Sequence, residues 1–197
     1  MAKILGISGS PRKGGNSDIL LKNILLGAQR HGISVELVRL CEYEFQSCIG
    51  CEKCRKSNRC EGLNDGMQLL YPKILEATGI VLISPTHNYN VTAWMKAFID
   101  RLYCFYGYTN DRPRNWWSIL AGQGRKAVLG VIGEQVDPDE AIGLTMTAMR
   151  LPLEALGYEV IGELQVVGLF DKGIVRNKPD YLQKAEQLGY RLAQQIK

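Results

Sequence analysis

No hydrophobic run in this 197-residue sequence approaches the ~20 residues that a membrane-spanning helix needs, so we predict no membrane span or membrane partner. The sequence also lacks a strong charge imbalance. Its formal net charge is +4 with dispersed basic residues, which argues against a nucleic-acid partner. Internal repeats, low-complexity segments and linkers are missing. Because the first residues show a strand pattern instead of a signal peptide, we expect a cytoplasmic protein.

Two common nucleotide motifs and an acid–base constellation are absent as well. The dinucleotide motif GxGxxG does not occur. The hydrolase P-loop GxxxxGK[ST] fails because Gly15 occupies the lysine position. No His, Asp or Glu forms a convincing acid–base group, so we predict no catalytic side chain.

What the sequence does contain is a single pattern of strands alternating with helices. Strands are expected at 4–7, 33–40, 79–84, 127–132 and 160–167. Helix starts are expected at Asn16 or Ser17, Asp65, Thr92 and Asp137, the last opening one long helix that Pro152 bends, and a closing helix spans 178–196. The second and fifth strands alternate apolar and polar residues, as edge strands do. We therefore predict a doubly wound, five-stranded parallel sheet of order 2-1-3-4-5, with helices on both faces.

The stretch 3–22 connects the first strand to the first helix through a loop of small and basic residues. Gly9, Gly14 and Gly15 permit close approach of the backbone, and the helix N-terminus favours negative charge. Arg12 and Lys13 add positive charge, while neighbouring serines supply hydroxyl donors. We interpret this loop as a phosphate cradle, although an ordinary glycine-rich turn is the alternative.

A second loop, 85–90, follows the third strand. In the order 2-1-3-4-5, the ligand crevice lies beyond the carboxyl ends of the first and third strands. The cradle and this loop therefore line one crevice, with a phosphate at one end and ring-contacting groups at the other. This geometry suits a mononucleotide.

The motifs SGSPRKGGNS and SPTHNYNVTAWMKAFIDR at these two loops resemble those of the flavodoxin-like NAD(P)H-dependent FMN reductases. Together with the strand order, they cover most of the chain. The resemblance implies a flavodoxin-like fold and bound FMN. It also implies that the phosphate is held by Ser10, Arg12, Asn16 and Ser17, and that the isoalloxazine is contacted by Pro85, Thr86, His87, Asn88, Tyr89 and Asn90.

Four cysteines follow the pattern C-x2-C-x2-C-x5-C, at Cys48, Cys51, Cys54 and Cys60. Structural zinc usually takes two well-separated CxxC pairs, and a disulfide is unexpected in the cytoplasm. Bacterial ferredoxins share the spacing of the first three cysteines, but their last spacer is shorter and a proline follows their fourth cysteine. The pattern is similar to the compact motif of the iron–sulfur flavoproteins, a branch of the same family, which implies a [4Fe–4S] cluster. A set of free thiols is the alternative.

Two irregular segments remain, the cysteine loop at 41–63 and an aromatic-rich insertion at 103–125. The second has no clear period, and a loop of that length is often functional. It could be a lid, a cofactor wall, a subunit interface or a packed surface excursion. We expect 1–197 to form one domain that carries both segments, with Cys41 and Cys104 as core or incidental thiols.

The sequence as a whole thus predicts an FMN-dependent oxidoreductase that passes electrons between FMN and a [4Fe–4S] cluster. The expected donor is NAD(P)H or a ferredoxin-like protein, and relatives suggest a homo-oligomer, either a dimer or a tetramer. The alternatives are a cluster-free NAD(P)H-dependent FMN or quinone reductase, and a non-enzymatic redox or metal sensor.

Overall fold

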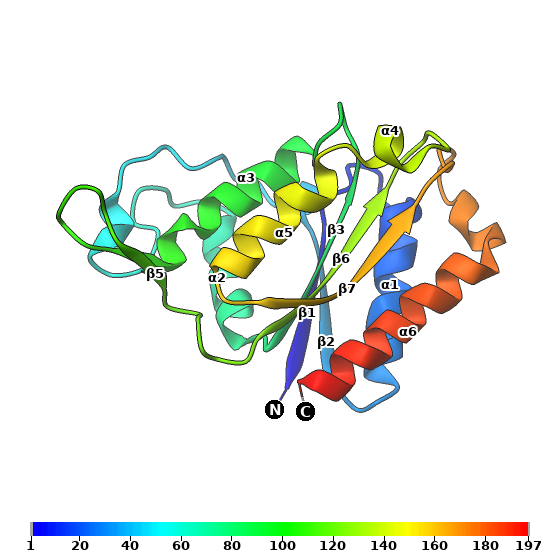
Figure 1. Cartoon of the computed structure of the whole chain (residues 1–197), viewed down its shortest axis with the longest axis horizontal. Helices are drawn as coiled ribbons and strands as arrows, with labels where there is room; N and C mark the ends of the chain where they lie inside the picture. The colour runs from blue at the N-terminus through cyan, green and yellow to red at the C-terminus, as the bar shows by residue number, and fades with distance from the viewer. Residues whose placement is uncertain (1, 197) are drawn as a thin grey trace.

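Five parallel strands form the central sheet of the computed structural model, which describes residues 2–196. The strand order is β2-β1-β3-β6-β7, which confirms the predicted order 2-1-3-4-5 (Figure 1). The strands are β1 (Lys3–Ser8), β2 (Ser34–Arg39), β3 (Gly79–Pro85), β6 (Lys126–Ile132) and β7 (Glu159–Val166). Six of the seven β3 residues are buried, whereas β2 and β7 are mostly half-buried, as edge strands should be.

Helices cover both faces of the sheet, which is therefore doubly wound and flavodoxin-like (Figure 1). One face packs on α1 (Asn16–Gln29) and α6 (Pro179–Gln195). The other packs on α2 (Met67–Glu76), α3 (Ala93–Arg101) and α5 (Thr145–Ala155). Each face has its own cluster of buried apolar side chains, and the β1 residues divide between them because successive side chains point to opposite faces.

The helices α1 and α6 approach closely because each contributes a glycine to the contact. A Cβ atom on Gly189 would overlap the carbonyl oxygen of Ile24, and one on Gly27 would overlap the carbonyl oxygen of Glu186. Backbone lies against backbone here, so neither helix can accept a larger residue without moving away from the other.

Of the four predicted helix starts, two are capped as predicted, and at the other two a glycine holds the cap position. Asp65 precedes the Gly66 cap of α2, although its Oδ1 accepts from the N–H of Met67 at 3.1 Å. Thr92 Oγ1 accepts a hydrogen bond from the N–H of Met95, and Asp137 accepts one from the N–H of Glu140, as the sequence indicated. At α1 the cap position is Gly15, which makes no side-chain cap, and Asn16 is already the first helical residue. The Asn16 side chain instead reaches the segment after β7, a tertiary contact that a local pattern cannot predict.

The long helix predicted after Asp137 is wrong, because it consists of two helices, α4 (Pro138–Ile142) and α5. Gly143 separates them with a φ of 50° and a ψ of −127°, which end the helix. The aromatic insertion, for which no regular structure was predicted, contains a two-stranded antiparallel hairpin, β4 (Tyr106–Tyr108) and β5 (Trp116–Ser118).

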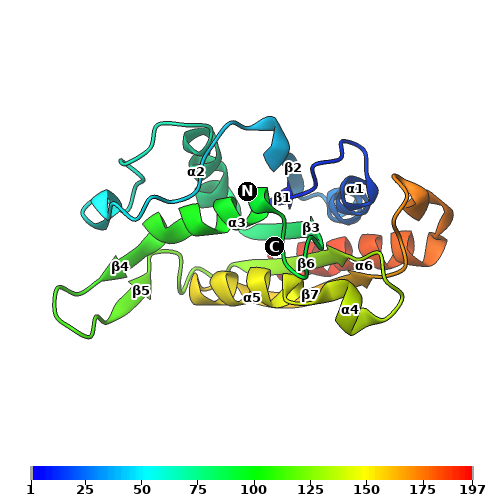
Figure 2. The same ribbon diagram turned by 90° about the horizontal axis from the view of Figure 1, so that it is seen from above.

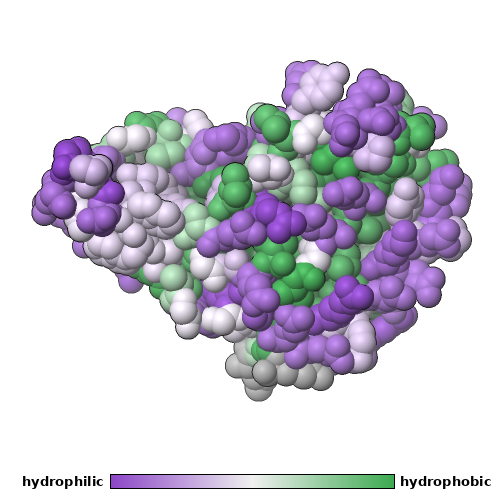
Figure 3. Space-filling view, in the orientation of Figure 1, coloured by the Kyte–Doolittle hydropathy of each residue, from purple (hydrophilic) through white to green (hydrophobic). Residues whose placement is uncertain are grey.

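This hairpin and the cysteine loop project together from one side of the sheet (Figure 2). In the space-filling view they form a narrow lobe that is mostly pale or purple, so its visible surface is polar to intermediate in hydropathy (Figure 3). No helix within residues 2–196 has the length and apolar character needed to cross a membrane.

Candidate functional site

The buried carboxylate of Asp18 holds the loop after β1 through hydrogen bonds to both of its ends. The Ser8 hydroxyl donates to Asp18 Oδ1 at 2.7 Å, and the N–H of Gly14 donates to Asp18 Oδ2 at 2.8 Å. Gly14 has a φ of 69°, in the left-handed region where glycine is favoured. Arg39, at the end of β2, lies 3.5 Å from the same carboxylate and offsets its charge. Asp18 therefore fixes the shape of the loop from the first turn of α1.

The open side of this loop carries free donors. Since α1 begins at Asn16, the N–H groups of Asn16 and Ser17 have no acceptor within the helix. Both residues line a cavity, together with Ser10 and Arg12. All four residues predicted to hold a phosphate thus border one space, and the helix dipole makes that space favourable for an anion.

The side chains of two of these residues already have partners. Asn16 donates to the carbonyl of Asp171 at 3.0 Å and accepts from the N–H of Val175 at 3.2 Å. Arg12 donates to the carbonyl of Phe170 at 3.1 Å and lies 5.1 Å from the centre of its ring. Asn16 therefore offers its backbone N–H to a ligand, whereas exposed Arg12 keeps further N–H donors for one.

The loop after β3 reaches the cavity with its first three residues only. Pro85, Thr86 and His87 line the cavity, whereas the remaining three predicted contact residues do not: Asn88, Tyr89 and Asn90. His87 and Asn90 pair through both backbone hydrogen bonds, and the two residues between them have positive φ. This tight turn carries Asn88 and Tyr89 out into solvent, and the Tyr89 carbonyl accepts from the N–H of Leu144.

Further cavity-lining residues come from the ends of β6 and β7, and the sequence interpretation did not include them. They are Ile132, Glu134, Leu169, Phe170 and Lys172. Their position follows from the same rule that placed the crevice, because parallel strands bring their carboxyl ends to one edge of the sheet. The rule could have found them had it been applied to every strand of the sheet, the edge strand β7 included.

The cavity fits a mononucleotide phosphate and ring in its donor chemistry. One end offers backbone N–H groups, hydroxyls and Arg12, and the other offers a proline, a threonine and a histidine. The two ends are tied together, because Thr92 Oγ1 donates to the Gly9 carbonyl at 2.7 Å and Gly9 N–H donates to the Ile83 carbonyl at 2.8 Å. The spacing between the ends is thereby set by the sheet.

A second pocket lies in the cysteine loop. All four cysteines of the predicted motif line it, and it is completed by other loop residues with Arg101, Tyr103 and Cys104. Within residues 2–196, no three His, Cys, Asp or Glu side chains are close enough to hold a single metal ion. A four-iron cluster holds its thiolates farther apart, because each thiolate binds a different iron. Four soft sulfur donors around one pocket therefore fit a cluster better than a single ion.

The thiols in and beside this pocket differ in acidity. Burial raises the pKa of Cys54, and burial raises the pKa of Cys104 to about 12. Burial also opposes ionisation of Cys60, but the Tyr71 hydroxyl, nearby backbone N–H groups and Arg101 outweigh it and lower its pKa. The chain thus favours the thiolate at Cys60, which is the form that binds metal.

The hairpin braces the cysteine loop. Asn58 donates to the carbonyls of Cys104 and Tyr106, and Arg55 donates to the carbonyl of Thr109. Glu52, in turn, forms an ion pair with Arg114 at 2.8 Å. Since Arg55 is bound to the hairpin and to Glu52, the basic side chains of this loop that remain exposed are Lys53, Lys56 and Arg59.

The two pockets lie at opposite ends of α3. Thr92 and Met95 at its start touch the phosphate loop, whereas Arg101 at its end borders the cysteine pocket. The cysteine loop leaves the carboxyl end of β2, so strand direction alone would place the cysteines beside the crevice, but the two pockets share no lining residue. The loop is long, and the ion pair between Asp65 and Arg101 ties its far end to the C-terminus of α3.

Comparison with protein families gives one match, which covers residues 2–129 and is described as NADPH-dependent FMN reductase. Among individual proteins, an iron–sulfur flavoprotein of Archaeoglobus fulgidus is 34% identical over 194 residues, covering 98% of this chain and 79% of that protein. An iron–sulfur flavoprotein of Methanocaldococcus jannaschii is 38% identical over 99 residues, covering 50% of this chain and 51% of that protein. The latter match therefore spans about half of the relative.

Solved structures share the fold at lower sequence identity. A flavone reductase superimposes with a TM-score of 0.73 at 20% identity, covering 98% of this chain and 62% of that one. An NAD(P)H:quinone oxidoreductase from Methanothermobacter marburgensis superimposes with a TM-score of 0.72 at 20% identity, covering 97% of this chain and 98% of that one.

Proposed function

Because this chain belongs to the NADPH-dependent FMN reductase family, in its iron–sulfur flavoprotein branch, we propose that it is an oxidoreductase that binds FMN in the crevice and an iron–sulfur cluster in the cysteine loop. One observation carries the proposal. The chain has two separate donor sets, N–H and hydroxyl groups around one cavity and four thiols around another. We also propose that residues 1–197 act as one domain with the cysteine loop and the hairpin as insertions.

The residues of the crevice bind and orient the cofactor. Backbone N–H groups of Asn16 and Ser17, the Ser10 hydroxyl and the Arg12 guanidinium would hold the phosphate, while Asp18 keeps their loop in shape. Pro85, Thr86 and His87 would flank the ring, with Thr86 held by the Thr145 hydroxyl at 3.0 Å. When bound, FMN supplies the hydride and electron chemistry that no side chain provides.

The four thiols would ligate a [4Fe–4S] cluster, and the names of the similar proteins support this assignment. We propose NAD(P)H as the electron donor on the ground of the family and a ferredoxin-like protein as the alternative. Since the two pockets lie at opposite ends of α3, we further propose a homo-oligomer in which the cysteine loop of one copy approaches the crevice of another.

The proposal is tested by the absorbance spectrum of anaerobically purified protein, with iron and acid-labile sulfide counted against flavin. We expect one flavin and about four iron atoms per chain. Flavin without iron would contradict the cluster and favour the plain reductase. Iron without flavin would contradict the FMN site.

The released flavin should be FMN and not FAD. The crevice has one phosphate loop. Among the described residues, no second helix N-terminus with free N–H donors lies beside that loop, and an adenine nucleotide would need one. Heating the protein and separating the supernatant by chromatography identifies the flavin. Recovery of FAD as the main species would contradict this assignment.

Replacing Arg12 with alanine should weaken FMN binding. The loss of a charge-assisted hydrogen bond costs ~1.5–3 kcal/mol, or roughly a tenfold to hundredfold increase in Kd. Fluorescence titration of the apoprotein with FMN measures the change. Lys13→Ala is the matched control. It removes the same charge from the next position in the sequence, but Lys13 does not line the cavity. Equal losses in the two variants would mean that Arg12 acts only through its charge, without direct contact.

A further inference from the structure

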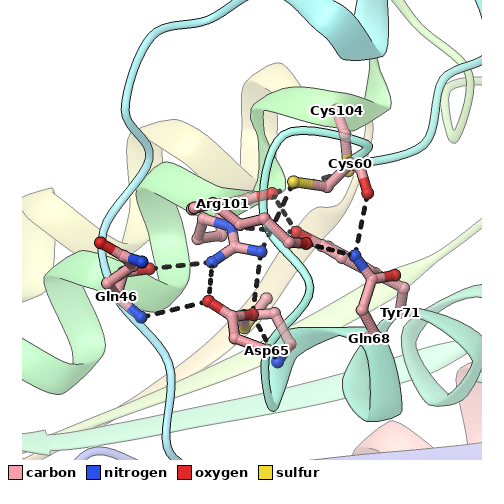
Figure 4. Close-up of polar contacts among 9 residues, drawn as sticks. Gln46, Cys60, Asp65, Gln68, Tyr71, Arg101 and Cys104 are labelled. Atoms are coloured by element: carbon pink, nitrogen blue, oxygen red, sulfur yellow. Dashed lines mark hydrogen bonds and ion pairs between the residues drawn. The ribbon is translucent and has the colours of Figure 1, made fainter.

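Arg101 is a buried arginine, and all five of its N–H donors have acceptors (Figure 4). Nε donates to the Tyr71 hydroxyl at 3.2 Å. Nη1 donates to the Gln46 carbonyl at 2.9 Å and to Asp65 Oδ2 at 2.6 Å. Nη2 donates to Asp65 Oδ1 at 3.0 Å, and its second donor faces Cys60 Sγ at 3.5 Å. Four contacts thus lock the guanidinium, and the fifth reaches a predicted metal ligand.

The partner carboxylate is fixed as well. Asp65 binds Arg101 through both oxygens, and it also accepts from the N–H of Met67 at 3.1 Å and from the N–H of Gln46 at 3.3 Å. The contact with Met67 anchors Asp65 to the start of α2. Because a bidentate pair of planar groups has little freedom, Asp65 determines where the Nη2 donor points.

Cys60 is held from its backbone too. Gln68, on the first turn of α2, donates to the carbonyl of Cys60 at 2.9 Å and to the carbonyl of Leu63 at 2.7 Å (Figure 4). The main chain at Cys60 is therefore attached to α2, and its sulfur is attached to α3. By contrast, Cys48 and Cys51 are exposed.

We propose that Arg101 is a positioning residue of the cysteine loop, which fixes Cys60 Sγ and sets the reduction potential of the group that the four thiols bind. This inference rests on the proposed cluster. A hydrogen bond to a ligand sulfur stabilises the more negative, reduced form and raises the reduction potential. Because Asp65 offsets the charge of Arg101, the effect of the pair on Cys60 Sγ depends on where the Nη2 donor points as well as on charge.

This role predicts that the potential depends on the direction of the guanidinium as well as on its charge. Arg101→Gln removes a positive charge and the N–H···S bond, so the midpoint potential of the loaded protein should fall. Arg101→Lys keeps the charge but lacks the planar fork that binds Asp65 and reaches Cys60 Sγ at the same time, so its midpoint potential should also fall. Outer-shell changes of this kind also cost roughly tenfold to hundredfold in metal affinity, which we expect for Arg101→Gln.

Arg125→Gln is the matched control. Arg125 is another buried arginine, but it donates to the carbonyls of Ile74, Leu75 and Ala77 at the opposite end of α2, and it lines no part of the cysteine pocket. Its loss should lower the melting temperature and leave the midpoint potential and iron content unchanged.

The experiment is a redox titration of wild type and the three variants after anaerobic reconstitution with iron and sulfide, with iron counts and thermal melts on the same samples. A lowered potential or lost iron in Arg101→Gln, with Arg125→Gln unchanged, supports the inference. A wild-type potential in loaded Arg101→Gln overturns it. If Arg101→Gln does not fold, Arg101→Lys decides, since a lowered potential supports the role and an unchanged one overturns it.

Two outcomes distinguish the proposed cluster from the role of Arg101. Wild type that takes up no iron contradicts the proposed cluster and this inference with it. Wild type that takes up iron, while both pocket variants keep its potential and iron content, contradicts the role of Arg101 alone.

Discussion

Serine in place of Cys51 is expected to remove most of the cluster iron from the anaerobically purified protein. Cys51 lines the cysteine pocket, and Gly62 leaves room for its sulfur, because a Cβ atom on residue 62 would overlap Cys51 Sγ. A serine hydroxyl is a harder and less acidic ligand than a thiol, so it replaces a thiolate poorly at iron. Iron should fall from about four atoms per chain to well below that number, whereas bound flavin should stay at the wild-type level.

The matched control is Cys41→Ser, the same change at a cysteine outside the pocket. Colorimetric iron and sulfide assays, normalised to flavin, give the comparison. The cluster assignment is wrong if Cys51→Ser retains the wild-type iron content, or if Cys41→Ser loses as much iron as Cys51→Ser does.

The second large effect is expected from Gly189→Ala in α6. Alanine favours a helix over glycine by about 1 kcal/mol, so a solvent-exposed site would become more stable. At residue 189 the new methyl group would overlap the carbonyl oxygen of Ile24 in α1, and a backbone atom cannot turn aside. Because the obstacle is backbone, we expect the upper end of the ~1–3 kcal/mol that overpacking costs. After the helix gain is subtracted, a net loss of about 1–2 kcal/mol lowers the melting temperature by several degrees in a chain of this size.

Gln183→Ala serves as the control, because residue 183 is exposed on the same helix and should change the free energy of unfolding by less than about 0.5 kcal/mol. Chemical denaturation of both variants tests the sign. A Gly189→Ala protein as stable as the wild type would show that α1 and α6 can separate without loss.

Several features followed from the sequence because local chemistry decides them. The strand order came from burial patterns, and it is confirmed by the pairing of β1 with both β2 and β3. The caps at Thr92 and Asp137 were predictable because each bond spans only three residues. The flavin contacts and the cysteine ligands remain predictions, although each group lines, at least in part, one cavity.

Other features depend on tertiary contacts that no local pattern carries. Arg101 ends the second family motif, but no role was assigned to it, because its contact with Cys60 joins residues 41 positions apart. Asn16 was expected to cap α1, but its side chain is bound to Asp171 and Val175, about 155 residues away. Gly143 indicated a break between α4 and α5, but the helical spacing of the residues around it led us to predict one continuous helix.

Two of the motif cysteines, Cys54 and Cys60, pack against one buried cluster without belonging to its buried members, and this arrangement bears on how the chain folds. None of the four motif cysteines is among the buried members of either cluster, and the loop is tied down by Asp65, Gln68 and Asn58 through bonds that need no metal. Zinc fingers, in contrast, are unfolded until their metal arrives. We therefore expect the sheet and its helices to fold without a bound metal, so that loss of the proposed cluster would leave the scaffold of the cysteine loop in place.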